Sequence, residues 1–242
     1  MSAKILHGDA TKASDWERAL LGEKANALIT DPPYCILTRR RKGGDPREKK
    51  DKKIERGPLR RFENVREYRE FTAEWMKAGA KFLKAGAPLV VWTNLLGKEP
   101  ILTVAAELGW TCFRGEYVWG KRTREGNSGE EILRVVEVAV VLTQDQAAPA
   151  QVEDPAIPWA VVAGYDDDGE GARWGAHPSH KPFGVLEPLV RGWTRPDRLV
   201  MDPFSGSGSI PLAAARLGRR AVGLEIEAEW AARGQRRILE AG

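Results

Sequence analysis

Short apolar runs alternate along this chain with longer segments in which apolar residues recur every three or four positions. The runs predict buried strands at residues 4–6, 27–30, 88–93, 111–119, 135–143, 199–201 and 221–224. The longer segments predict helices at residues 68–83, 100–108, 182–191, 210–217 and 229–239. A further helix is expected from Ser14, which has the pattern of an N-cap with Glu17 three residues later. Strands that alternate with helices predict an α/β fold, a mostly parallel sheet flanked by helices.

The regular pattern weakens in two places after residue 120. Residues 121–130 lie between two expected strands, are polar and are expected to be mobile. Residues 144–158 are rich in Ala and Pro and residues 166–171 in Gly and Asp, so residues 144–175 are expected to be irregular. With 242 residues in all, we expect a single domain that spans residues 1–242.

Composition argues against several classes of protein. No apolar run reaches 18 residues and the N-terminus has no signal-peptide pattern, so neither a membrane span nor secretion is expected. Cys35 and Cys112 lack the spacing of a metal site or a disulfide framework, and the three histidines have no acidic partners at ligand spacing. We therefore expect no metal, and a reducing cytoplasm as the compartment.

Positive charge is concentrated in one segment. Residues 39–61 hold twelve Lys or Arg and four Asp or Glu, a local net charge of +8 in a chain of net charge +4, so the remainder carries about −4. A basic block on a slightly acidic body is typical of proteins that bind a polyanion, and a solvated loop without a partner is the alternative. The residues expected to contact nucleic-acid phosphates are Arg39, Arg40, Arg41, Lys42, Lys49, Lys50, Lys52 and Lys53.

Two motifs about 170 residues apart carry the candidate chemistry. Asp31-Pro32-Pro33-Tyr34 follows the apolar run 27–30, and Asp202-Pro203-Phe204-Ser205-Gly206-Ser207-Gly208 follows the run 199–201. Each is expected in a loop at the carboxyl end of a strand, where open α/β sheets bind ligands. Either motif alone also fits an ordinary turn, but together they predict a reaction site beside a cofactor site. The glycine loop lacks the third glycine of a dinucleotide fingerprint and the Lys of a triphosphate loop.

The order of these motifs resembles that of the beta-class amino-methyltransferases of restriction–modification systems, in which the catalytic motif precedes the cofactor motif. A third element supports the resemblance, because His177-Pro178-Ser179-His180-Lys181-Pro182 is similar to the His-Pro-Thr-Gln-Lys-Pro element of that family. Ser179 and His180 depart from the usual Thr and Gln. The resemblance implies a Rossmann-like methyltransferase fold with circularly permuted motif order. It also implies methylation of an exocyclic amino nitrogen in DNA, with S-adenosylmethionine as the methyl donor.

The resemblance also implies where the cofactor binds. It places Ser179, His180 and Lys181 in the cofactor pocket, with Lys181 at the cofactor carboxylate. It gives Asp9 a role at the cofactor adenine, although Asp9 also fits a helix-entry residue. Glu225 ends the next strand, 23 residues after Asp202, and is expected to accept hydrogen bonds from the ribose hydroxyls. The glycine loop is expected to contribute Asp202, Phe204, Ser205, Gly206, Ser207 and Gly208. Among these, Phe204 is expected beside the thioether.

The catalytic motif suits an amine that is hard to methylate. An aromatic amino group is a poor nucleophile because its lone pair is delocalised into the ring. The carboxylate of Asp31 and the carbonyl of Pro32 are expected to hold the two N–H groups so that the lone pair faces the methyl group, and Pro33 helps to fix that carbonyl. The target base must be flipped out of the duplex, and Tyr34 is expected to stack on it. The thiol of Cys35 would suit carbon methylation, but carbon-5 cytosine methyltransferases carry their Pro-Cys in a different setting. We therefore interpret Cys35 as a packing residue.

We therefore interpret the chain as a methyltransferase that acts on adenine N6 in double-stranded DNA. Members of the resembled class with Ser at the first motif position tend toward cytosine, whereas Asp, as at Asp31, tends toward adenine. The alternatives are cytosine-N4 methylation, an RNA-adenine or protein-glutamine methyltransferase, and a nucleic-acid-binding module without activity. Residues 144–175 are too short for the recognition domain that relatives insert there. The DNA sequence that the enzyme recognises is thus expected to be short or loosely defined. Alternatively, recognition depends on the basic loop, a homodimer partner or another subunit.

Overall fold

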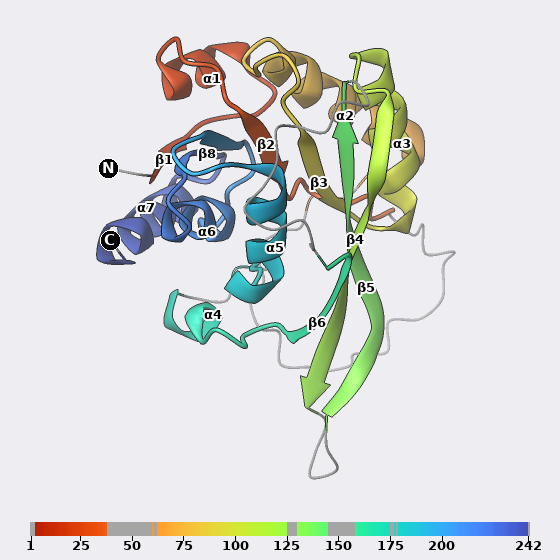
Figure 1. Ribbon diagram of the computed structural model, residues 1–242. Coiled ribbons are helices and arrows are strands. Elements are labelled where there is room, and N and C mark those ends of the chain that lie inside the picture. The colour runs from red at the N-terminus through yellow and green to blue at the C-terminus, as the bar shows by residue number, and fades with distance from the viewer. Residues whose placement is uncertain are drawn as a thin grey trace, which may run out of the picture.

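The computed structural model describes residues 3–37, 60, 62–124, 130–144, 158–174, 177 and 179–241. Figure 1 shows a twisted sheet with helices on both faces, and the two chain ends lie on the same side of the molecule. The eight residues expected to contact phosphates, all within residues 39–53, lie outside the described residues. Among the described residues, no helix has the length and apolar character needed to cross a membrane.

The described strands form one eight-stranded sheet. Their order across the sheet is β1 (Ala3–His7), β8 (Arg220–Glu225), β7 (Leu199–Asp202), β2 (Ala27–Thr30), β3 (Leu89–Thr93), β5 (Glu130–Thr143), β4 (Cys112–Arg124) and β6 (Ala160–Gly164). β5 pairs antiparallel with β3 and β4, and the other pairings are parallel. The expected mostly parallel sheet of Rossmann-like type is thereby confirmed.

The strand order reverses between β2 and β7, which lie side by side near the centre of the sheet. Ala27 pairs with Val200, and Leu28 pairs with Met201. The chain crosses from β2 to β3 on one side of this pair, and from β7 to β8 on the other. Ligands of open α/β sheets bind beyond the strand ends at such a reversal. Asp31 and the glycine loop, which follow these two strands, are therefore brought to one place.

Helices cover both faces of the sheet (Figure 1). One face packs against α1 (Ala13–Leu20), α2 (Val65–Ala80) and α3 (Leu95–Glu107). The other packs against α5 (Phe183–Trp193), α6 (Ser209–Arg216) and α7 (Ala228–Ala241). The short helix α4 (Glu170–Trp174) follows β6. Two apolar cores therefore lie on opposite faces of the sheet, and the site lies beyond the carboxyl ends of its central strands.

The apolar pattern of α2 sets its packing. Phe71 and Trp75 are buried, so the apolar residues that recur along this helix belong to the core. The side chain of Asn64 begins the helix by accepting a 2.9 Å hydrogen bond from a backbone N–H of the first turn. A Cβ atom added to Gly79 would lie 2.4 Å from the Trp16 ring, so glycine at this position allows α1 to pack closely on α2.

Two predicted helix starts are wrong. α1 begins at Ala13, and the N-cap position is Lys12, so Ser14 does not cap the helix. α3 begins at Leu95 and contains Pro100 in its interior. Its start is fixed by Asn94, whose side chain accepts a 2.9 Å hydrogen bond from the backbone N–H of Gly97. Capping thus outweighed the helix-breaking tendency of proline.

The polar segment 121–130, expected to be mobile, contains the ends of two strands, and its residues 125–129 lie outside the described part of the chain. β4 continues to Arg124 and β5 begins at Glu130, and the two remain paired to those ends. A backbone ladder does not depend on side-chain polarity, so a polar hairpin can extend beyond the core. β6 and α4 also form within residues 144–175, which were expected to be irregular. β6 pairs in parallel with β4 at the sheet edge.

Candidate active site

Asp31 lies directly beyond the carboxyl end of β2, and its side chain is 6% exposed. Its Oδ2 atom accepts a 2.8 Å hydrogen bond from the ammonium group of Lys181. Its Oδ1 atom is buried and has no hydrogen-bond partner among the described residues. Burial raises the pKa of Asp31, although the Lys181 charge opposes the rise. Since a buried acceptor without a donor is costly, Oδ1 marks a place where a ligand donor would be stabilised.

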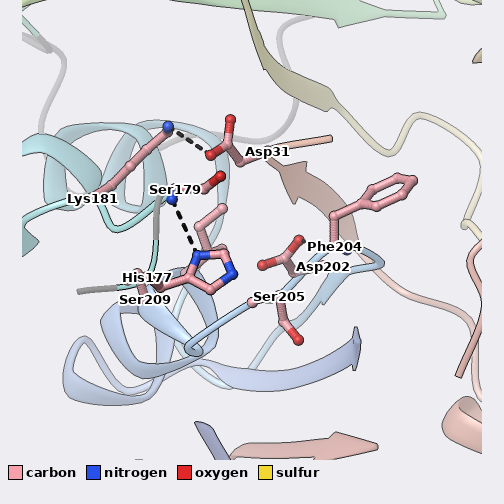
Figure 2. A pocket seen from close by; sticks show the side chains of 10 residues that line it. Asp31, His177, Ser179, Lys181, Asp202, Phe204, Ser205 and Ser209 are labelled. Atoms are coloured by element: carbon pink, nitrogen blue, oxygen red, sulfur yellow. Dashed lines mark hydrogen bonds and ion pairs between the residues drawn. The ribbon is translucent and has the colours of Figure 1, made fainter. Parts of the chain in front are cut away.

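The ammonium group of Lys181 is buried between two carboxylates (Figure 2 shows its bond to Asp31). It lies 2.8 Å from Oδ2 of Asp31 and 2.8 Å from Oε2 of Glu137. The hydroxyl group of Tyr34 donates a 2.7 Å hydrogen bond to the same oxygen of Glu137. Lys121 forms an ion pair with the other oxygen of Glu137. Two ammonium groups and two carboxylates therefore neutralise one another behind the loop 31–34.

Glu137, in β5, was not predicted as a site residue. It is the one acidic residue in the apolar run 135–143, and a charge within a buried strand is the signal that could have revealed it. Burial would raise the pKa of Glu137, but the charges of Lys181 and Lys121 outweigh it and lower the pKa to about 2. Burial and the nearby carboxylates raise the pKa of Tyr34, so its hydroxyl group stays protonated and donates.

The glycine loop connects β7 to α6 with two residues in the left-handed region. Gly206 has φ 49° and Gly208 has φ 81°, a conformation that glycine adopts at little cost. The backbone N–H of Gly206 donates a 2.8 Å hydrogen bond to Oε2 of Glu225. The hydroxyl group of Ser205 donates a 2.9 Å hydrogen bond to the carbonyl of Leu224. The loop is therefore tied to the end of β8, where the predicted ribose-binding acid lies.

Asp202 ends β7 and is almost completely buried. Its Oδ1 atom accepts hydrogen bonds of 2.7 Å from the Thr30 hydroxyl and 3.2 Å from the Phe204 backbone. Within the described part of the chain, its buried Oδ2 atom has no hydrogen-bond partner. Burial raises the pKa of Asp202 to about 7. A cationic ligand at Oδ2 would favour the ionised carboxylate.

A cavity of about 210 Å³ opens beside these groups. Its wall includes the acids Asp9 and Glu225 and the aromatic rings of Phe71, Phe204 and Trp230. A smaller hollow adjoins it and is lined in part by Asp202, Ser205 and Lys181 (Figure 2). Gly206 also lines it. Asp31, His177, Ser179 and Phe204 border both spaces. This arrangement can accommodate a ligand that has an aromatic part in the cavity and a cationic part near Asp202.

The 177–182 element divides its side chains between this space and the protein interior. His177 packs across Gly206, where an added Cβ would lie 2.6 Å from the imidazole ring, and meets Trp230 edge-on at 4.6 Å between ring centroids. Burial lowers the pKa of His177 to about 4, so the ring is neutral. Ser179 is exposed and borders both spaces.

His180 and Lys181 are engaged with protein groups. The buried His180 ring lies 3.4 Å from Asp168 and 3.1 Å from the hydroxyl group of Ser209. Its ring is absent from the described lining of both spaces, so it supports the element from behind. Lys181 borders the smaller hollow, but its ammonium group faces Asp31, not an open position for a cofactor carboxylate.

The other predicted positions lie close to the same edge of the sheet. Asp9 borders the cavity, and its Oδ1 atom accepts hydrogen bonds of 2.9 Å and 2.8 Å from the backbone and hydroxyl group of Thr11. Pro33 also borders the cavity, and Pro32 is buried beside it. Ser207 is buried in the glycine loop. Cys35 is fully buried in the core, which agrees with its interpretation as a packing residue.

Two curated relatives are similar to short parts of this chain. The protein YubD of Escherichia coli K12 is 44% identical over 62 residues, which are 26% of this chain and 27% of YubD. Type II methyltransferase M2.MboI of Moraxella bovis is 41% identical over 66 residues, which are 27% of this chain and 24% of the relative. The chain thus spans about a quarter of the length of the curated relatives it matches.

Two solved structures share the fold over nearly the whole chain. The complex of M1.HpyAVI with S-adenosylmethionine aligns with a TM-score of 0.67 and 20% identity, and covers 98% of this chain and 99% of that one. The cytosine-N4-specific PvuII DNA methyltransferase aligns with a TM-score of 0.64 and 17% identity, and covers 100% of this chain and 91% of that one.

The match that decides the family extends over most of the sequence. Residues 25–235 match the family of N6 and N4 methyltransferases described as DNA methylase. They include the 31–34 motif, the 177–182 element and the glycine loop. These three segments meet around one hollow at the carboxyl ends of the central strands. This chain therefore belongs to the DNA methylase family of N6 and N4 amino-methyltransferases.

Proposed function

We propose that this chain transfers a methyl group from S-adenosylmethionine to the N6 amino group of an adenine flipped out of double-stranded DNA. The observation that carries the proposal is the convergence of Asp31 and Asp202 on one hollow, each with a buried oxygen that lacks a partner in the described residues. Asp31 offers an acceptor to a neutral amine, and Asp202 offers one to a cation. Membership in the DNA methylase family supports this class of reaction.

The residues around the cavity fit S-adenosylmethionine. Oδ2 of Asp202 suits the cofactor ammonium group, the remaining lone pairs of Glu225 suit the ribose hydroxyls, and Asp9 suits the adenine amino group. Gly206 and Gly208 allow the backbone to approach the ligand closely. A solved complex of the similar protein M1.HpyAVI contains the same cofactor. When bound, S-adenosylmethionine would supply an electrophilic methyl group attached to a good leaving group, a sulfonium sulfur.

The chain itself must orient the target amine and remove one proton. Oδ1 of Asp31 and the carbonyl of Pro32 accept the two N–H groups, so that the nitrogen lone pair points toward the methyl donor. Methylation leaves a positive charge on this nitrogen, and one proton passes to the Asp31 carboxylate and from there to water. The ring of Tyr34 stacks on the flipped base, a contact worth roughly 1–3 kcal/mol.

The basic segment 39–61 is proposed to bind the DNA phosphates. It begins eight residues after Asp31, so the sequence tethers it beside the reaction site. Arg60, the one described residue of this segment, borders the cavity. Its guanidinium group lies 4.0 Å from the centroid of the Phe71 ring. The described end of the basic segment therefore lies beside the cavity that Asp31 also borders, which supports the proposal.

Adenine N6 is preferred over cytosine N4 because of Asp31. The resemblance drawn from the sequence associates Asp at the first motif position with adenine and Ser with cytosine. Cytosine N4 is the second candidate. The similarity in fold to the cytosine-N4-specific PvuII enzyme supports this alternative. Both amines present two N–H groups to two acceptors, so the mechanism above applies to either.

The test is to incubate the full chain with methyl-labelled S-adenosylmethionine and mixed-sequence duplex DNA, and then to identify the labelled nucleoside by mass spectrometry. Label in N6-methyladenine is expected, and the Asp31→Asn variant is the negative control. Label in N4-methylcytosine alone would replace the proposed base. A parallel incubation with RNA distinguishes an RNA methyltransferase, and binding of labelled cofactor without any transfer would point to a module that lacks activity.

A further inference from the structure

Lys181 and Glu137 reach the catalytic loop from two other parts of the fold. Lys181 precedes α5, Glu137 lies in β5, and Asp31 follows β2. One ammonium group lies 2.8 Å from an oxygen of each carboxylate. The side chain of Lys181 is 2% exposed, so its ion pairs are shielded from water. Removing one partner of a buried ion pair leaves the other charge uncompensated, and this strongly changes its energy.

We propose that Lys181 and Glu137 are positioning residues for the methyl transfer, an inference that rests on the proposed function. Lys181 holds Oδ2 of Asp31 and thereby leaves Oδ1 for the target amine. Glu137 holds Lys181 in place and also binds the hydroxyl group of Tyr34. One acid from β5 thus fixes both the acceptor and the aromatic ring of the catalytic loop.

The position of Lys181 argues against a main role at the cofactor carboxylate. Its charge is already balanced by Asp31 and Glu137 at hydrogen-bond distance. A third carboxylate would have to compete with both, and Glu137 is also bound by Lys121. The arrangement suits a group that serves Asp31, because the shared ammonium keeps an otherwise disfavoured buried carboxylate ionised.

The charges around Asp31 predict opposite effects for the two residues. The titratable groups that face Asp31 are Lys181, Glu137, Tyr34, Tyr68 of α2 and Asp202 of β7. Without the Lys181 ammonium, burial and the Glu137 carboxylate would both raise the pKa of Asp31 further. Without the Glu137 charge, a repulsion is lost and Lys181 is left to Asp31, so the pKa of Asp31 would fall.

The experiment reads the ionisation of Asp31 directly. Full-length protein labelled with carbon-13 at the Asp carboxyl groups is titrated by NMR, and Asp31→Asn identifies the signal. We expect Lys181→Met to raise the pKa of Asp31 by at least about one unit and Glu137→Gln to lower it. Lys181→Arg keeps the positive charge, so the pKa of Asp31 in this variant should stay close to the wild-type value. Lys98→Met is the matched control. It removes a half-buried ion pair of 2.7 Å between Lys98 and Glu116, away from the site.

Two further measurements separate positioning from a structural or cofactor role. The acidic limb of the pH dependence of single-turnover methyl transfer should move up in Lys181→Met and down in Glu137→Gln. The affinity for S-adenosylmethionine, measured by calorimetry, should stay within about threefold in both variants. An unshifted Asp31 titration in Lys181→Met, or a tenfold loss of cofactor affinity with an unshifted pH profile, would overturn the proposal.

The outcomes remain distinct from those of the proposed function. If Lys181→Met does not fold, Glu137→Gln decides, because an unchanged or raised pKa of Asp31 contradicts the inference. If the wild-type chain methylates neither DNA nor RNA, the proposed function fails. The NMR titration still determines whether Lys181 and Glu137 control the ionisation of Asp31.

Discussion

The hydroxyl group of Thr30 donates a 2.7 Å hydrogen bond to Oδ1 of Asp202 and so joins the last residue of β2 to the last residue of β7. Thr30 directly precedes Asp31, so this bond connects the acid of the catalytic loop with the acid of the glycine loop. The two loops extend from adjacent strands about 4.8 Å apart, and the sheet fixes the distance between them. The bond also leaves Oδ2 of Asp202 available to a ligand.

Asp202→Asn should stabilise the cofactor-free protein at neutral pH. The pKa of Asp202 is raised to about 7 in the folded state, so its contribution to stability is present below the unfolded pKa of 3.8 and is lost as the pH rises toward 7. Asn does not ionise, and the stability advantage of the variant should grow by roughly 1.4 kcal/mol per pH unit in this window. Urea unfolding of both proteins across the window checks this, and parallel pH profiles would contradict it. The variant should also bind S-adenosylmethionine more weakly.

Glu225→Gln should weaken S-adenosylmethionine binding at least about tenfold, because the ribose hydroxyls lose a charged acceptor. Gln is preferred to Ala, since Glu225 also accepts the backbone N–H groups of Gly206 and Glu227, and a carbonyl oxygen retains part of that support. Calorimetric titration measures the affinity. Glu229→Gln, which removes an exposed acid from α7, is the control. Equal affinity in Glu225→Gln and wild type would remove Glu225 from the cofactor site.

Asp31→Asn should abolish methyl transfer and leave cofactor binding nearly intact. The amide cannot take the proton, and it loses the charge that draws Lys181 toward Oδ2. Single-turnover assays with saturating cofactor measure the loss. Residual turnover above about a tenth of wild type would show that Asp31 does not orient the amine.

Neutralising Arg40, Arg41, Lys42, Lys49 and Lys50 should weaken DNA binding for all sequences alike. Each lost phosphate contact should reduce the slope of log affinity against log salt by about 0.9. Binding to two unrelated duplexes over a range of salt concentrations gives both quantities. A slope equal to that of the wild type would show that this segment is a solvated loop without a role in binding.

Local pattern determined much of this fold. The apolar runs at 27–30 and 199–201 predicted β2 and β7, and the motifs that follow them lie, as expected, in loops at the carboxyl ends of those strands. These inferences succeed because burial and strand geometry act over a few neighbouring residues. Boundaries set by capping were less predictable: Asn94 began α3 before Pro100, and backbone pairing extended β4 and β5 through polar residues.

The sequence by itself marked Asp31, Asp202, Glu225 and Lys181 as candidate site residues, but it did not show which of these charged groups pair with one another. Tertiary structure decided that Lys181 lies against Asp31, 150 residues away, and that Glu137 lies between Lys181 and Tyr34. Such contacts depend on strand order and on the register that places β5 beside β3. The energy of a buried charge is set by whichever partners the fold brings within hydrogen-bond distance, and spacing along the chain does not encode that distance.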